Sequence, residues 1–238
     1  MNEIYKDKLE ILRQRVSIGL RHGLAILGKV NGDVEQAEKL FQQEMLSLVI
    51  NKTGVTKAIA TKHLIKTNFD INSALKSIDE ERYTLTERIL KQCKDNKEEA
   101  LNKLAYAVEQ KNKLIRNFWL DLEDLQKLSQ QEFCLLTIIE WLHYNDYEGF
   151  IVAIHFHLEV VTDQIKEQLL LPEIAGIIRK AKEIHESQFE QQEIKFKKEK
   201  AISPTPEFCE QEDLFDEKKP LLIDTLYEFV KKHVNKFP

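Results

Sequence analysis

The chain has 238 residues with only 7 glycines and 5 prolines, and 32% of its residues are charged, mostly Lys and Glu. This composition is typical of an all-α protein, because Lys and Glu favour exposed helix faces while Gly and Pro interrupt helices. The net charge of −5 gives no general attraction to phosphate backbones, so nucleic acid is not expected as a partner.

The cysteines and the amino-terminal residues indicate the cellular compartment of the protein. Cys93, Cys134 and Cys209 lie far apart, which indicates neither a disulfide framework nor a zinc site with paired cysteines. The amino-terminal residues alternate in charge and lack the apolar core of a signal peptide. No apolar run approaches the roughly 20 residues that a membrane span needs. We therefore expect a cytoplasmic protein with no membrane partner and no cofactor.

The first third of the chain contains an internal repeat, in which residues 8–44 align with residues 45–81 at an offset of 37 positions. Apolar residues of the two copies recur at helical spacing. The pattern predicts two small units of three helices each, at residues 8–44 and 45–82. Within residues 16–44, the identical pairs are Leu27/Leu64, Lys29/Lys66, Asn31/Asn68, Asp33/Asp70, Ala37/Ala74, Lys39/Lys76 and Glu44/Glu81.

Both copies predict the same corner between two helices. Asn31 and Asn68 suit the left-handed residue that ends a helix, because Asn tolerates positive φ. Asp33 and Asp70 then suit the cap of the next helix, where a carboxylate accepts hydrogen bonds from free backbone N–H groups. Gln36, three residues after Asp33, predicts a capping box in the first copy.

These residues carry a resemblance to a known family. The run LEILRQRVSIGLRHGLAILGKVNGDVEQAEKL resembles the amino-terminal ubiquitin-associated-like domain of elongation factor Ts, through a Leu-Arg pair, a glycine turn and an Asn-Gly-Asp corner. The run TGVTKAIATKHLIKTNFDINSAL is similar to the ubiquitin-associated domain of the nascent-polypeptide-associated complex. The resemblance implies small helical units that bind a protein of the translation or nascent-chain machinery.

The resemblance also indicates which residues could bind the partner. The turn positions that correspond to the binding loop of these domains are Ile18, Gly19, Leu20, Gly54, Val55 and Thr56. The Thr-Asp-Val-Gly-Phe segment of elongation factor Ts is absent, since Thr162 and Asp163 are followed by Gln164, and the Met-Gly-Phe type loop of ubiquitin binders is absent too. Neither nucleotide exchange nor ubiquitin binding is expected. The alternative is that both units are purely structural.

Residues 83–200 are predicted to form a bundle of longer helices. The run FCLLTIIEWL is apolar on nearly all sides, which predicts a central buried helix. The run FIVAIHFHLEVV alternates as a strand would. However, Phe150, Ile154, Leu158 and Val161 form a stripe at helical spacing, and a helix is favoured because no partner strands are evident.

The end of the chain is predicted to be a linker followed by a helix. Residues 201–220, AISPTPEFCEQEDLFDEKKP, combine prolines with six acids, and Phe208, Leu214 and Phe215 stand as isolated apolar residues. They predict an acidic linker, either a disordered tether or a short docking motif. Residues 221–238 are predicted to form an amphipathic helix.

One set of residues could bind a metal ion. His155, His157 and Glu159 would share one face of a strand. On a helix the two histidines point about 200° apart and the site vanishes. The helical interpretation therefore predicts no metal site, and His155 with Glu159 is then a surface pair.

A second set could serve acid–base chemistry. Glu140, His143 and Asp146 lie near one helical face, but no nucleophile or anion-binding group is evident beside them. The chain also lacks a Gly-rich phosphate loop and a catalytic serine or cysteine motif. We therefore expect a protein that is not an enzyme.

Two functional hypotheses follow. The first is a non-enzymatic helical adaptor whose amino-terminal pair of units binds a protein partner. The second is an acidic inhibitor or immunity-like protein that masks a basic partner, because residues 118–173 hold eleven acids against two bases, a balance of −9. Asp146, Tyr147 and Glu148 would lie on that acidic surface.

Overall fold

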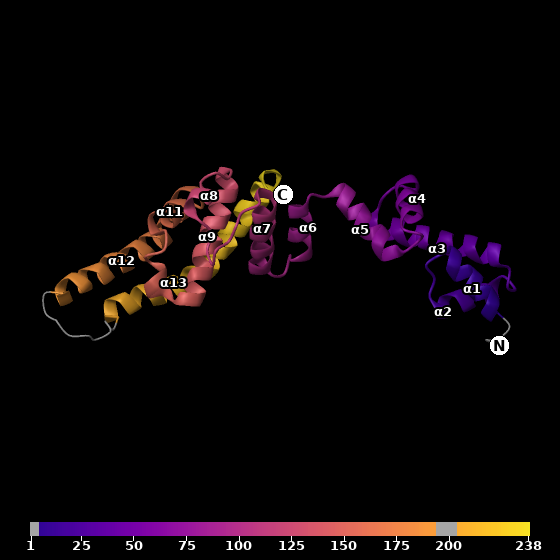
Figure 1. Cartoon of the computed structure of the whole chain (residues 1–238), viewed down its shortest axis with the longest axis horizontal. Coiled ribbons are helices and arrows are strands. Elements are labelled where there is room, and N and C mark those ends of the chain that lie inside the picture. Colours follow the sequence, from indigo (N-terminus) through magenta and orange to yellow (C-terminus); the bar gives the residue numbers. More distant parts are fainter. Residues whose placement is uncertain (1–4, 194–203) are drawn as a thin grey trace. The chain divides into compact units, whose positions relative to one another are not determined.

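The computed structural model describes residues 5–193 and 204–238 (Figure 1). Over these residues the protein is built of helices and contains no β-strand, which confirms the predicted all-α class. The chain divides into two compact units, an amino-terminal unit Met1–Tyr83 and a carboxyl-terminal unit Thr84–Pro238, and each is described by itself. Within the described parts of the chain, no helix is both long and apolar enough to span a bilayer.

The amino-terminal unit has five helices around one aliphatic core. Helix α3 packs against each of the other four, so it forms the centre of the unit. The helices are α1 (Lys6–Arg15), α2 (Leu20–Lys29), α3 (Val34–Thr53), α4 (Lys57–Lys66) and α5 (Ile71–Arg82).

The predicted boundary between two three-helix units is wrong, because residues 44 and 45 lie inside α3. Phe41, Met45 and Val49 are buried on one face of this helix and carry it across the boundary. The helix ends only at Gly54, which has a φ of +66°. The two aligned segments, residues 8–44 and 45–81, therefore share α3 and one continuous core.

The two predicted corners are confirmed. Asn31 and Asn68 have φ values of +51° and +49°. The carboxylate of Asp33 accepts a hydrogen bond from the backbone N–H of Gln36 at 3.0 Å, and that of Asp70 accepts one from the backbone N–H of Ser73 at 2.7 Å. Each Asp therefore satisfies one free N–H group at a helix start.

The capping box predicted for Gln36 is wrong. The side-chain Nε2 of Gln36 donates to Oδ2 of Asp33 at 3.0 Å, so its amide faces the carboxylate. The backbone N–H of Asp33 already donates to the carbonyl of Val30 at 3.0 Å and offers no bond for a capping box. The hydrogen bond from the backbone of Gln36 lowers the pKa of the Asp33 carboxyl.

The carboxyl-terminal unit is a larger bundle. Its central helix is α9, which packs against α7, α10, α11 and α13 and is buried on nearly all sides from Cys134 to Leu142, as predicted. The α-helices are α6 (Leu85–Gln92), α7 (Lys97–Asn112), α8 (Leu122–Leu125), α9 (Gln130–Glu148), α10 (Phe150–Ala153), α11 (Leu158–Asp163), α12 (Pro172–Glu193) and α13 (Pro206–Lys232). A π-helical turn, Gln164–Gln168, follows α11, and a 3₁₀ turn, Val234–Lys236, follows α13.

The ambiguous run at residues 150–161 contains no strand, as expected, but it is not one continuous helix. It forms α10 and α11, which are separated by a turn at residues 154–157 that ends at His157, where φ is +49°. Phe150, Ile154, Leu158 and Val161 of the predicted stripe are all buried.

The acidic linker predicted at residues 201–220 is wrong from residue 206 onward, and residues 201–203 lie outside the described part of the chain. Helix α13 runs without interruption from Pro206 to Lys232 and includes Pro220 in its interior. Phe208, Phe215 and Leu222 recur every seven residues and are buried, so they form one stripe rather than isolated contacts. The bundle that was predicted to end at residue 200 therefore includes α13.

Candidate protein-binding surface

Two of the amino-terminal residues predicted to bind a partner lie in the core. Ile18 is 5% exposed and Val55 is 7% exposed, so neither side chain is accessible. Leu20 is 59% exposed and remains available. The amino-terminal unit therefore exposes one of its three apolar candidate residues to a partner.

The other three amino-terminal candidates lie at helix ends. Gly19 is the residue before α2, and Gly54 ends α3 in the left-handed conformation. Thr56 caps α4 by accepting a hydrogen bond from the backbone N–H of Ile59 at 3.5 Å. These positions have a structural role in the turns between helices.

The predicted acidic surface is largely neutralised by bases from elsewhere in the fold. Of the eleven acids in residues 118–173, eight form ion pairs, and most of their partners lie outside that range. The pairs are Asp124–Lys127, Glu132–Lys111, Glu140–Arg116, Asp146–Lys219, Glu159–Lys182, Asp163–Arg179, Glu167–Lys166 and Glu173–Lys218. The local balance of −9 thus overstates the field that a partner would meet.

The three residues predicted on the acidic surface behave differently from one another. Asp146 pairs with Lys219 at 2.5 Å. Glu148 is exposed at the end of α9. Tyr147 is 82% exposed, and its ring centroid lies 6.4 Å from that of Trp119. Tyr147 thus connects this region to a group of aromatic side chains.

Trp119 lies at the centre of this aromatic group. Its ring centroid is 4.8 Å from that of Tyr144 and 5.8 Å from that of Phe156, and the last two rings stack at 4.1 Å. The group joins the loop after α7, the end of α9 and the connection between α10 and α11. Such ring contacts stabilise the packing of these segments in addition to the stabilisation from the apolar area that they bury.

The residue before Trp119 is held in an unfavourable conformation. Phe118 has a φ of +66°, and the backbone N–H of Trp119 donates to the carbonyl of Asn117 at 2.9 Å. This hydrogen bond closes a three-residue γ-turn, and the form with positive φ is rare and strained. The Phe118 side chain is nevertheless 93% exposed, and Ile115 in the same loop is 73% exposed. We call Ile115, Phe118, Trp119 and Tyr147 the aromatic surface.

A buried carboxylate holds both sides of this turn. Glu140 on α9 is 2% exposed and accepts two hydrogen bonds from Nη1 of Arg116, at 2.8 and 2.9 Å. It also accepts one from the backbone N–H of Leu120 at 2.7 Å. Nη2 of Arg116 donates to Glu109 on α7 at 2.6 Å. Glu140 and Arg116 thus form a clamp that fixes the loop before and after Phe118.

The charges of the clamp pair with one another, with Glu140 buried and Arg116 partly exposed. Burial alone would lower the pKa of the Arg116 guanidinium, but the hydrogen bond to Glu109 and the charge of Glu140 outweigh it and raise that pKa. Burial lowers the pKa of nearby His157, against the opposing charges of Asp121 and Glu140. The clamp is suited to hold a loop rather than to transfer a proton.

The predicted acid–base set does not come together. Glu140 belongs to the clamp, while Nε2 of His143 lies 3.0 Å from Oδ1 of Asn102. Asp146 pairs with Lys219. The three side chains therefore serve three separate contacts.

The residues considered for a metal site also separate. Nε2 of His155 lies 3.0 Å from Nδ1 of His185 on α12, and Glu159 pairs with Lys182. His157 lies at the break between α10 and α11, where its ring contacts that of Phe156. Among the described residues, no group of three metal-ligating side chains is present.

The sequence carried one signal for the clamp. A charge count over residues 118–173 leaves out Arg116, which lies two residues before that segment. Arg is the basic residue best suited to pair with a buried carboxylate. This Arg stands alone before an aromatic pair, after an amphipathic helix. Its partner, 24 residues away on α9, could be found only from the structure.

Comparison with known proteins identifies the family of the chain. The model of the YfbN C-terminal domain matches residues 84–235. The chain is also 32% identical to "Uncharacterized protein YfbN" of Escherichia coli (strain K12) over 242 residues, which cover 98% of this chain and 95% of that protein. The chain belongs to the YfbN family. The YfbN C-terminal domain begins where the carboxyl-terminal unit begins, so the clamp and the aromatic surface lie within it. No solved structure matches the chain.

Proposed function

We propose that this member of the YfbN family is a non-enzymatic helical adaptor that binds a protein partner through the aromatic surface. The observation that carries the proposal is the exposure of Phe118, which is 93% exposed in a strained turn that the buried carboxylate of Glu140 and the partly exposed Arg116 maintain. Strained backbone persists only where the surrounding structure enforces it, and it is concentrated at binding and catalytic sites.

The energetics favour a binding role for Phe118. Burying a Phe side chain contributes about 1.5 to 3 kcal/mol, and this gain is absent while the ring stays in water. A partner with an apolar pocket would recover it. Because the clamp holds the loop in one conformation, little entropy is lost on binding. Aromatic residues at the centre of an interface often dominate its affinity.

The class of partner is proposed from a different part of the chain. The resemblance of residues 8–82 to ubiquitin-associated-like domains favours a partner from the translation or nascent-chain machinery. Leu20, which is 59% exposed, is the amino-terminal candidate that could contact it. The adaptor would then hold two proteins, or two sites of one protein, through its two units.

The inhibitor hypothesis has weaker support. Eight of eleven acids in residues 118–173 pair with bases of the same chain, so electrostatic attraction to a basic partner is reduced. If the hypothesis is correct, charge reversal at Asp146 and Glu148 should slow association with the partner, and added salt should do the same.

Photo-crosslinking in the full chain tests the proposal. A photoreactive amino acid replaces Phe118 in one variant and Leu20 in another, and crosslinked proteins are identified after irradiation in cells. We expect a specific partner at Phe118, and its capture by the native chain should fall at least tenfold in Phe118→Ala, a loss of about 1.4 kcal/mol.

Ile65→Ala is the matched control, since Ile65 is 64% exposed in the amino-terminal unit and lies outside the aromatic surface. It should leave capture unchanged. A partner that crosslinks only at Leu20 and binds Phe118→Ala as well as the native chain would contradict the role of the aromatic surface.

A further inference from the structure

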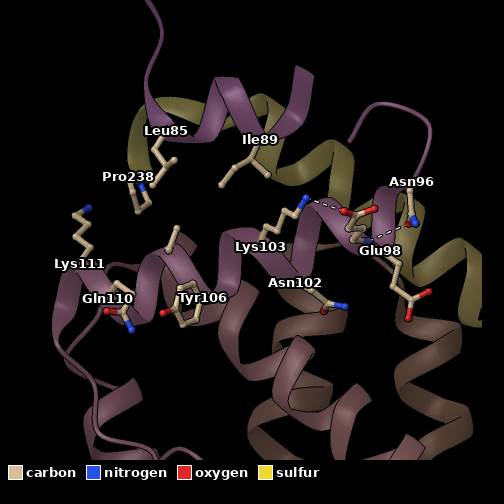
Figure 2. Close-up of a pocket in the computed structure, with 12 residues that line it drawn as sticks. Leu85, Ile89, Asn96, Glu98, Asn102, Lys103, Tyr106, Gln110, Lys111 and Pro238 are labelled. Atoms are coloured by element: carbon tan, nitrogen blue, oxygen red, sulfur yellow. Dashed lines mark hydrogen bonds and ion pairs between the residues drawn. The ribbon is translucent and has the colours of Figure 1, made fainter. Parts of the chain in front are cut away.

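Two exposed apolar surfaces of the carboxyl-terminal unit differ in how their charges are paired. A groove between α6 and α7 has a volume of about 960 Å³ and apolar walls (Figure 2). Among the charged residues that line it, Glu99 pairs with Lys103 at 2.6 Å and Lys111 pairs with Glu132 at 2.9 Å. The charges of the groove are therefore mostly neutralised by the chain itself and indicate no particular partner.

The aromatic surface, by contrast, lies beside carboxylates that have no ion pair. Asp121 follows Trp119 by two positions, and Glu148 directly follows Tyr147 on α9. Of the eleven acids in residues 118–173, the three that form no ion pair with a described residue are Asp121, Glu123 and Glu148. All three are exposed. The acids left unpaired in this region are thus those next to the aromatic surface.

The charge of Asp121 acts on the aromatic group. Oδ1 of Asp121 accepts a hydrogen bond from the backbone N–H of Glu123 at 2.9 Å, which fixes the carboxylate at the start of α8. Burial lowers the pKa of His157, and the negative charge of Asp121 opposes this change. The ring of His157 contacts that of Phe156, whose centroid lies 5.8 Å from that of Trp119. The field of this carboxylate therefore reaches the aromatic group.

The bases of the same loop are mostly occupied. The two carboxylates that hold Arg116 outnumber its single charge. Lys127 pairs with Asp124 at 2.7 Å, and the charges of two neighbouring acids also act on it. Lys113 is the one base of residues 113–127 that forms no ion pair with a described residue. Three free acids against one free base leave the aromatic surface with a negative charge.

These charges decide what kind of surface can cover Phe118. Burying its ring removes water from the neighbouring carboxylates, and this loss of hydration is costly unless an opposite charge replaces the water. A purely apolar partner would leave the cost uncompensated, and an acidic partner would add repulsion. An ammonium or guanidinium group would compensate it and would also gain from contact with the face of an exposed ring such as that of Tyr147. Apolar side chains are still needed to bury Phe118.

We propose that the partner segment that covers the aromatic surface combines apolar side chains with Lys or Arg. Its apolar side chains pack against Ile115 and Phe118, and its cations lie against Tyr147 and face Asp121 or Glu148. The inference rests on the proposed function, because it specifies the partner that binds the same surface. It differs from the inhibitor hypothesis, because it needs a few local acids rather than a broad acidic field.

Three synthetic peptides that share the same leucines test the charge of the partner. Lys, Ser or Glu fills the remaining positions, and each peptide is titrated into the full chain labelled with ¹⁵N. The two tryptophan indole N–H signals report separately, because Trp119 belongs to the aromatic surface while Trp141 is fully buried and donates to the carbonyl of Ala153 at 2.8 Å. We expect the Lys peptide to shift the Trp119 signal and to bind about tenfold tighter than the Ser peptide, and added salt should reduce this difference. The Glu peptide should leave the signal unchanged.

The double variant Asp121→Asn, Glu148→Gln tests whether the free carboxylates are responsible. Both replacements keep the size of the side chain, and Asn can cap α8 as Asp does. This variant should lose most of the preference for the Lys peptide. The double variant Glu183→Gln, Glu210→Gln is the matched control, because it changes the net charge equally at exposed positions of α12 and α13. It should keep the preference.

The inference and the proposed function can fail separately. A Lys peptide that leaves the Trp119 signal in place, or that binds no tighter than the Ser peptide, would overturn the inference, and so would an Asp121→Asn, Glu148→Gln variant that keeps the native preference. The peptide comparison uses the native chain, so it decides even if this variant does not fold. A partner that crosslinks at Phe118 and binds the variant as well as the native chain overturns only the inference, whereas the absence of any crosslinked partner at Phe118 contradicts the proposed function.

Discussion

The two units of the protein are stabilised in different ways. The buried core of the amino-terminal unit is almost entirely aliphatic, with Phe41 as its one buried aromatic residue among those described. The core of the carboxyl-terminal unit contains Trp141 and several buried Phe rings, together with the buried carboxylates of Glu132 and Glu140. The amino-terminal unit is therefore stabilised mainly by aliphatic packing, whereas the carboxyl-terminal unit also depends on aromatic contacts and buried carboxylates for its stability.

The polar contacts between distant segments differ in burial as well. In the amino-terminal unit, Arg15 pairs with Glu38 and Arg82 donates to the carbonyl of Thr53 at exposed positions. In the carboxyl-terminal unit, Glu140 contacts Arg116 across 24 residues and Pro238 contacts Thr86 across 152. The candidate binding surface therefore lies where contacts between distant segments, rather than local turns, determine the backbone conformation. It can be tested by variants matched between the units.

Phe215→Ala should have the largest effect. Phe215 is fully buried in α13, with its ring centroid 5.2 Å from that of Trp141, so truncation should cost about 3 to 5 kcal/mol of unfolding free energy. Urea unfolding followed by tryptophan fluorescence measures it, because both tryptophans, Trp119 and Trp141, lie in the carboxyl-terminal unit. Phe41→Ala is the control and should leave the tryptophan transition in place. A loss below about 0.5 kcal/mol for Phe215→Ala would favour a linker instead of a helix.

Glu140→Ala should have the second largest effect. It leaves the partly exposed guanidinium of Arg116 half paired and the backbone N–H of Leu120 without its acceptor, and losing hydrogen bonds to a charged group costs about 1.5 to 3 kcal/mol. The fluorescence of Trp119 should also change as the loop is released. Glu44→Ala in the amino-terminal unit removes the partly exposed contacts to His22 and Lys29 and should cost less than about 1 kcal/mol. Equal losses for the two variants would remove the distinction between the units.

Asp33→Ala and Asp70→Ala should have intermediate and nearly equal effects. Each removes one helix cap, which contributes about 1 kcal/mol, and the two corners have the same geometry. Hydrogen exchange at the first turns of α3 and α5 is the measurement. Gln36→Ala is the control and should change exchange little, because no capping box is formed. A large difference between the two Asp variants would show that the shared helix makes the corners unequal.

The effect of pH should be the smallest. Burial and the neighbouring His155 lower the pKa of His185, against the opposing charge of Glu186, from an ordinary value of 6.5. Below pH 6.5 the unfolded chain therefore binds the proton more readily than the folded chain, so stability is complete above that pH and falls as the pH is lowered toward 5. His185→Gln should reduce this dependence of the unfolding free energy on pH between pH 7 and pH 5, as measured in the tryptophan transition. A steeper slope in the variant would mean that the pKa of His185 is raised instead.

Much of the fold could be predicted from short-range patterns. The two Asn and Asp corners follow from backbone preferences and capping that involve only residues within one turn, so they formed as expected. The buried run around Trp141 and the helical stripe from Phe150 to Val161 also depend only on spacing. These features hold in any tertiary arrangement that buries the apolar face.

The helix boundaries and the linker could not be predicted in this way. Ending a helix at residue 44 or forming a linker at residues 206–220 depends on whether a neighbour covers the apolar side chains there. Phe208 and Phe215 look isolated beside their acidic neighbours, and only contact with Trp141 and Phe150 makes them core residues. Tertiary packing overrides the local preference of an acidic, proline-containing segment.

The amino-acid sequence by itself determined the helical class, the repeated corner and the central helix, because each depends on side chains that are neighbours along one helix. Only the tertiary structure decided which candidates a partner can reach: Ile18 and Val55 became core, and Phe118 became exposed. The physical reason is that burial depends on contacts between segments distant in the sequence. The clamp of Arg116 and Glu140, which turns Phe118 outward, is such a contact.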